Sequence, residues 1–210
     1  RQVRPSMGSW ITYGLGSENQ NLPGFIAMCP GGYPIQETQN WQSAFLPGVY
    51  QGTYVDTRHT DVEKLIENVR NSSLSLPDQR RQLDLLRALN ERHQKKRQRD
   101  ARLEARIQSF ELAYRMQMAA PEALDISKEP ARVQEMYGLN RNESKTFGRQ
   151  CLLARRLVER GVRFVQIFFS SSKISGGAVN DVPWDGHNDI NVNHRDCAAS
   201  VDQPAGALLT

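Results

Sequence analysis

The chain has 210 residues, of which 39% are hydrophobic and 24% are charged, an ordinary composition for a globular protein with a buried core. No apolar run approaches the roughly 18 to 20 residues that a membrane-spanning helix needs, so we expect no membrane span. The net charge is +4, but residues 80–106 alone hold ten Lys or Arg against four acidic residues. Because the basic surplus belongs to one segment, it indicates a solvated helical face and argues against nucleic-acid binding.

The three cysteines, Cys29, Cys151 and Cys197, lie far apart and none belongs to a C-x-x-C motif. Their odd number and wide spacing indicate neither a disulfide framework nor a zinc knuckle. Cys151 lies within an apolar helical pattern, so we expect it to be a small core residue.

The first 32 residues predict a short helix, a polar turn and a buried strand. Ser6 is the expected N-cap of the helix, and its apolar side would include Trp10, Ile11 and Leu15. Phe25–Cys29 is a continuous apolar run that ends in a glycine-containing loop, which is typical of an inner strand of a parallel sheet. Residues 33–59 have no periodic face and predict an irregular segment held by its aromatic side chains.

Residues 60–138 predict a helical insertion. Thr60 and Glu63 have the spacing of a capping box at its first helix. Leucines and aromatic residues at spacings of three and four predict a long helical hairpin, with helices over about 78–98 and 100–119. Pro121 is expected to end the second helix, and a further short helix should end at Gly138.

The stretch "TFGRQCLLARRLVERGVRFVQIFF", residues 146–169, gives the clearest local pattern. It predicts a helix, a left-handed C-cap at Gly161 and a strand over Val162–Phe169. The buried face of the helix should contain Leu152, Leu153, Leu157 and Val158. A helix, a glycine and an apolar strand in this order indicate an α/β fold. The final residues, "QPAGALLT", are expected to begin another helix, so we expect the chain to be an internal fragment.

The predicted strand leads into "WDGH", where Asp185 and His187 stand two residues apart, and His194 follows. Carboxylate and imidazole together suit zinc, and the carboxylate also suits magnesium, calcium or manganese. Ligands of open α/β sheets bind beyond the carboxyl ends of the strands, which is where this motif is expected. A catalytic metal needs at least three protein ligands, so the spacing alone favours a polar loop anchored by Trp184. The metal site remains the alternative, and no catalytic residue is assigned.

Several segments resemble the bacterial family catalogued as domain of unknown function 1501. They include "RPSMGSWITYGLGSENQNLPGF", "LEARIQSFELAYRMQMAAPEALDIS", "FGRQCLLARRLVERGVRFVQI" and "WDGH", and the resemblance runs through nearly all 210 residues. The family is grouped with the alkaline phosphatase and sulfatase superfamily. The resemblance implies that residues 1–210 form part of an alkaline-phosphatase-like domain, a sheet flanked by helices and truncated at both ends. It also implies a periplasmic or secreted protein.

The resemblance further implies a metal-dependent hydrolase of phosphate or sulfate esters, with zinc, calcium or magnesium as the cofactor. Asp185 and His187 match the superfamily's ligand pair in order, His194 is a weaker candidate, and Asp202 matches a structural aspartate. The ligands of the classical phosphatase stand further apart, which weakens the ligand assignment. Gly186 replaces a commoner threonine, a change that adds backbone freedom without removing a donor atom.

The remaining ligands and the nucleophile would lie outside these residues, so the chain alone is expected to be inactive. Its substrate would be an anionic ester or a polysaccharide. Two alternatives remain open. One is a carbohydrate- or anion-binding protein without turnover on the same scaffold, and the other is a structural partner that docks through the basic helices.

Overall fold

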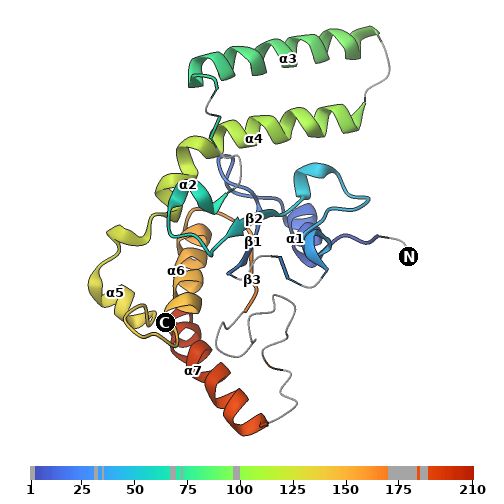
Figure 1. Cartoon of the computed structure of the whole chain (residues 1–210). Helices are drawn as coiled ribbons and strands as arrows, with labels where there is room; N and C mark the ends of the chain where they lie inside the picture. Colours follow the sequence, from blue (N-terminus) through green and yellow to red (C-terminus); the bar gives the residue numbers. More distant parts are fainter. Residues whose placement is uncertain are drawn as a thin grey trace.

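A computed structural model of the chain describes residues 3–30, 33–34, 36–66, 70–71, 73–96, 100–169, 184 and 189–210. These residues form a parallel sheet of three strands flanked by helices, as the sequence predicts (Figure 1). Asp185 and His187 lie outside the described residues, as do residues 170–183. None of the described helices combines the length and apolarity that crossing a membrane requires.

The strand order in the sheet is β2-β1-β3. The central strand β1 (Phe25–Cys29) has the predicted bounds, and β3 (Phe164–Ile167) lies inside the predicted strand. The strand β2 (Thr53–Asp56) corrects the prediction of an irregular segment over residues 33–59, which also contains the short 3-10 helices η1 (Glu37–Asn40) and η2 (Gly48–Tyr50). Only Val55 of β2 is fully buried, so pairing with β1 defines this strand more than any apolar pattern of its own.

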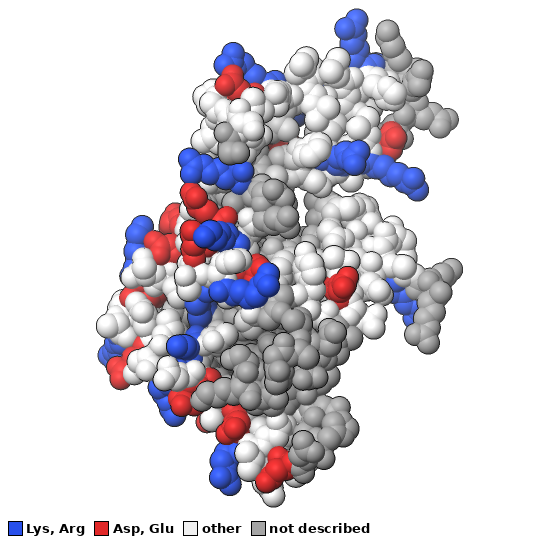
Figure 2. All heavy atoms as spheres, viewed as in Figure 1, with Lys and Arg blue, Asp and Glu red and all other residues white. Residues whose placement is uncertain are grey.

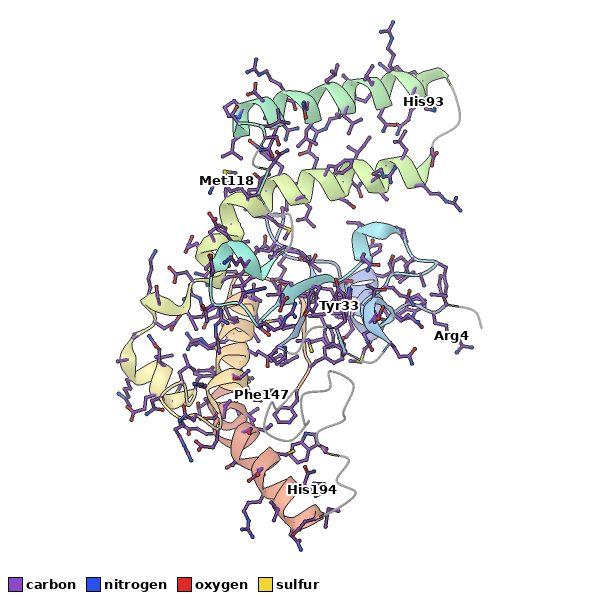
Figure 3. The ribbon with its side chains drawn as sticks, in the orientation of Figure 1. Arg4, Tyr33, His93, Met118, Phe147 and His194 are labelled. Carbon is purple, nitrogen blue, oxygen red and sulfur yellow. The ribbon has the colours of Figure 1, made fainter. Side chains whose placement is uncertain are left out.

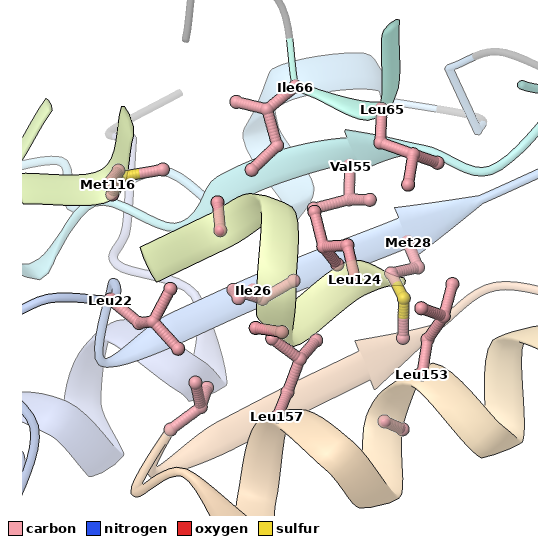
Figure 4. Close-up of a cluster of buried hydrophobic side chains, with 14 residues drawn as sticks. Leu22, Ile26, Met28, Val55, Leu65, Ile66, Met116, Leu124, Leu153 and Leu157 are labelled. Carbon is pink, nitrogen blue, oxygen red and sulfur yellow. The ribbon is translucent and has the colours of Figure 1, made fainter. Parts of the chain in front are cut away.

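Both faces of the sheet are covered, which explains why β1 is a continuous apolar run. Successive side chains of a strand point to opposite faces. Ile26 and Met28 enter the larger core, which Figure 4 shows between the sheet and the helices α4 and α6. Phe25 and Ala27 enter a second cluster with Trp41 on the other face.

The helix α6 (Lys145–Glu159) packs Leu153 and Leu157 on the larger core, whereas Leu152 packs in a separate cluster with Tyr137. Gly161 has a φ of +84° and ends the helix in the predicted left-handed conformation. The prediction that Val158 belongs to the buried face of α6 is wrong. Val158 is 56% exposed, and Ala154 is buried instead. The buried face thus rotates towards residues 150–154 because α6 is covered by α7 (Ile190–Leu208) as well as by the sheet.

The helix α1 (Met7–Leu15) has the opposite orientation to the predicted one. Its buried residues are Gly8, Ser9 and Thr12, whereas Trp10 is 46% exposed. The reason is a close approach at Gly8, where an added Cβ would lie 2.6 Å from the ring of Phe25. Ser6 does occupy the N-cap position, but its hydroxyl contacts the hydroxyl of Ser9 and no backbone N–H.

The predicted hairpin is formed by α3 (Leu76–Lys96) and α4 (Ala101–Leu124). The helix α3 stands away from the sheet at the top of Figure 1, whereas the C-terminal part of α4 packs on the larger core. Figure 2 shows Lys and Arg side chains spread over this hairpin. The expected stop at Pro121 is wrong, because α4 continues to Leu124. Proline removes one backbone hydrogen bond, and burial of Ala120, Ala123 and Leu124 in the larger core offsets that loss.

Two further corrections concern helix ends. The short helix α2 (Val62–Leu65) is capped by Asp61, whose side chain accepts from the N–H of Glu63, and not by Thr60. The residues "QPAGAL" form the last turns of α7 and do not begin a new helix, even though Pro204 lies within them. The segment before α6 contains the 3-10 helix η3 (Ile126–Lys128) and α5 (Ala131–Met136), and Gly138 follows with a φ of +70°.

Candidate functional site at the carboxyl edge of the sheet

The carboxyl ends of the three parallel strands lie at one edge of the sheet, and β2 brings charged side chains to it. Asp56 is the last residue of this strand, and Arg58 follows in the loop. The guanidinium of Arg58 binds both carboxylate oxygens of Asp56, with Nε 2.9 Å from Oδ1 and Nη2 2.5 Å from Oδ2. Burial alone would raise the pKa of Asp56, but the hydrogen bonds from Arg58 outweigh it and lower that pKa. His59 Nε2 lies 3.7 Å from Asp56 Oδ2.

Two neighbouring residues of α6 connect the ends of β2 and β3. Gln150 is almost fully buried; its Nε2 donates to Thr57 Oγ1 at 3.1 Å and lies 3.5 Å from the carbonyl oxygen of Phe168. Its Oε1 has no partner in the described part of the chain. Arg149 Nη1 donates to the carbonyl oxygen of Thr57 at 3.3 Å and to that of His59. The first half of α6 therefore lies at the edge where ligands of such sheets bind.

A row of aromatic rings extends from α6 to α7 along this edge. Ring centroids of Phe147 and Phe169 lie 5.7 Å apart, and those of Phe169 and Trp184 lie 5.8 Å apart. Trp184 in turn lies 5.8 Å from the ring of His194. Figure 3 shows Phe147 on α6 and His194 on α7 at this end of the molecule. Trp184 is the first residue of "WDGH", so the motif begins beside Phe169, two residues beyond the end of β3.

His194 holds Trp184 through a hydrogen bond, because its Nε2 lies 3.0 Å from the carbonyl oxygen of Trp184. A carbonyl can only accept, so Nε2 carries the proton, and Nδ1 is the acceptor nitrogen of the neutral ring. Metal-binding histidines commonly donate one ring N–H to a backbone carbonyl in this way.

Of the three predicted ligands, only His194 lies within the described residues. His194 lies beside Trp184, while Asp185 and His187 fall outside the described residues, and Asp202 is exposed on α7. Within the described ranges no group of three or more His, Cys, Asp or Glu residues is arranged to hold a metal. Asp56 is not an open ligand because Arg58 engages both of its oxygens. The ligand set therefore remains a prediction.

Sequence reasoning missed the residues that β2 and α6 bring to this edge. Asp56 and Arg58 could have been found only if β2 had been recognised as a strand. Arg149 and Gln150 offered a weak signal, since both are polar residues directly before the apolar run that begins at Cys151.

One protein family matches the chain over its whole length. The family model described as Protein of unknown function (DUF1501) matches residues 1–210. No curated protein and no solved structure matches the chain.

Proposed function

The chain belongs to the family described as Protein of unknown function (DUF1501), and we propose that the protein containing it is an exported, metal-dependent hydrolase of phosphate or sulfate esters. The proposal includes a relationship to the alkaline phosphatase and sulfatase superfamily, with the helices of residues 60–138 as an insertion. The proposed metal ligands are Asp185 and His187, with His194 as a third candidate. The proposed metal is zinc, calcium or magnesium.

The observation that supports the proposal is the position of Trp184. Its ring packs on Phe169 beyond the end of β3, and its carbonyl is held by His194. Asp185 follows Trp184 directly in the sequence. Beyond the carboxyl ends of parallel strands is the place where α/β proteins bind their ligands, so a metal-binding motif in this segment agrees with the general rule.

His194 could bind a metal through its second ring nitrogen. When Nε2 donates its hydrogen to the carbonyl oxygen of Trp184, Nδ1 keeps a free lone pair for the metal. The described residues do not complete a ligand set on their own, and the proposal therefore depends on Asp185 and His187. A bound divalent metal would polarise the ester and offset the charge that develops on the transferring group.

The test measures metal in the purified protein that contains this chain. Elemental analysis should find a divalent metal in the wild type and much less in Asp185→Ala and His187→Ala. Glu91→Ala is the control, because Glu91 is an exposed carboxylate on the hairpin and lies outside the proposed set. Turnover of aryl phosphates and aryl sulfates should fall together with the metal content. Unchanged metal content in Asp185→Ala would contradict the proposal.

A second candidate is a carbohydrate-binding protein without turnover, and a group of exposed aromatic rings favours it. Trp10 lies 5.9 Å from Tyr13 and 5.8 Å from Phe45, and Tyr13 lies 5.3 Å from Tyr50. Large exposed apolar groups of this kind mark interaction sites. This candidate predicts saturable polysaccharide binding that survives chelation and is lost in Trp10→Ala, without hydrolysis of either ester.

A further inference from the structure

We propose that Arg149 is the anion-binding residue at the carboxyl edge of the sheet, where its guanidinium receives two oxygens of a phosphate or sulfate group. The inference deepens the proposed function and depends on it for the class of substrate. The anion site itself is argued from the charges and contacts around Arg149 and involves no metal.

The first argument is that Arg149 has no acidic partner among the residues that the structure describes. It is only partly exposed, and none of the described carboxylates lies within ion-pair distance of it. Most other partly buried arginines do have such partners: Arg80 pairs with Glu111, Arg155 and Arg156 pair with Glu129, Arg160 pairs with Glu122, and Arg163 pairs with Glu18. Arg115 donates instead to the carbonyl oxygen of Gln20, but its charge still lowers the pKa of Glu111. A guanidinium removed from water without a counterion is costly, so this cation is suited to accept an anion.

The charges around Arg149 leave the edge positive. Asp56 ends the strand that precedes the loop contacted by Arg149, and Arg58 already neutralises it by binding both oxygens. Burial lowers the pKa of the Arg149 guanidinium, and no described charge counteracts that effect. An incoming oxyanion would supply the missing negative charge.

The second argument is the way in which Arg149 is held. Its Nη1 donates to two backbone carbonyls, those of Thr57 and His59, which fixes one corner of the guanidinium. No described residue accepts from its Nε or Nη2. These two donors form the planar fork that matches two oxygens of a phosphate or sulfate group. The carbonyl bonds orient the side chain, and the fork remains for a ligand.

The position of Arg149 agrees with this role. Phe147 and Gln150, its neighbours on α6, contact Phe169 and Thr57 respectively, so Arg149 lies between the ends of β2 and β3. This is the edge to which the aromatic row brings Trp184 and His194. An anion bound by Arg149 would therefore share the edge with the proposed hydrolytic site.

The experiment measures anion binding without metal. The protein that contains this chain is treated with EDTA and titrated calorimetrically with inorganic sulfate and, separately, with inorganic phosphate. We expect saturable binding that weakens by about tenfold or more in Arg149→Gln, since a charge-assisted pair of hydrogen bonds is lost. Arg149→Lys should have intermediate affinity, because lysine keeps the charge but not the fork. Arg163→Gln is the matched control, a partly exposed arginine that pairs with Glu18, and it should bind as the wild type does.

The outcomes separate this inference from the proposed function. Equal affinity in the wild type and in Arg149→Gln, or no saturable binding by the wild type, would overturn the role of Arg149. If Arg149→Gln does not fold, Arg149→Lys decides the matter, and wild-type affinity in that variant counts against the fork. Absence of metal and of turnover, with Arg149-dependent anion binding intact, would reject the hydrolase and leave the anion site standing.

Discussion

Gly148 lies so close to Tyr137 that a Cβ added to the glycine would be 1.9 Å from the carbonyl oxygen of the tyrosine. The oxygen belongs to the backbone, so it cannot rotate away as the end of a side chain could. Gly148 is therefore required for α6 to pack against the segment that follows α5. It is also the residue before Arg149, and the contact sets where α6 lies relative to the edge of the sheet.

We expect Gly148→Ala to lower the free energy of unfolding by about 2 to 3 kcal/mol, the upper part of the range for overpacked cores. Gly206→Ala is the control within another helix, since nothing lies within 4 Å of an added Cβ there. Alanine is the better helix former, so this control should gain about 0.5 to 1 kcal/mol. Urea unfolding followed by circular dichroism compares the two, and equal stability of the two variants would contradict the packing argument.

Glu129 joins the segment before α5 to α6 through two arginines. Its carboxylate is 2.6 Å from Arg155 Nη2 and also binds Arg156 Nη1, and the Glu129 side chain is only 10% exposed. Burial alone would raise the pKa of Glu129, but the hydrogen bonds from Arg155 and Arg156 outweigh it and lower that pKa. A depressed pKa in the folded state means that the ion pairs stabilise the protein above the unfolded pKa of glutamate. This stabilisation is lost as the pH falls through the folded value.

We therefore expect Glu129→Gln to cost about 3 kcal/mol at pH 7, because it leaves the buried Arg156 without a counterion and Arg155 with Glu159 alone. The difference from the wild type should shrink as the pH falls below the usual pKa of glutamate, about 4.3. Urea unfolding at a series of pH values measures this difference. A difference that stays constant down to the lowest pH would show that the carboxylate charge is not the cause.

The parts of the fold that the sequence predicts are those whose pattern is local. β1 is an unbroken apolar run, and the order of α6, Gly161 and β3 can be recognised within 24 residues. β2 was not predictable because its residues become a strand through pairing with β1. The orientation of α1 depends on the contact of Gly8 with Phe25, two residues whose proximity no helical periodicity reveals.

The candidate site likewise has a part that the sequence reveals locally and a part that depends on tertiary contacts. A carboxylate and an imidazole in "WDGH" can be noticed in the sequence, and so can the strand that precedes them. The role of Arg149 cannot, because it depends on the carbonyls of the loop after β2 and on the absence of an acidic partner within the described ranges. Charge balance at a sheet edge is a tertiary property.

Cys151 is expected to resist thiol reagents in the folded protein. It is fully buried in α6, and burial raises the pKa of its thiol to about 12. The reactive form is the thiolate, which is scarce at pH 8 with such a pKa. Iodoacetamide labelling followed by peptide mass spectrometry should show Cys151 modified in urea and protected in buffer. Rapid labelling of Cys151 in buffer would contradict its placement in the core.

His194 provides a sharper test of the proposed metal site than alanine substitutions do, because one substitution separates its two nitrogens. The amide of a glutamine can still donate to the carbonyl oxygen of Trp184, as Nε2 does at 3.0 Å, but it lacks Nδ1. If Nδ1 binds the metal, His194→Gln should lower metal affinity at least about tenfold, the loss that even a supporting group typically causes. The fold should be retained, since the bond to Trp184 is kept.

His59→Gln is the matched control, because His59 contacts Asp56 and is outside the proposed set. Competition with a chromogenic chelator measures the affinity. Wild-type affinity in His194→Gln would remove His194 from the ligands and limit its role to holding Trp184.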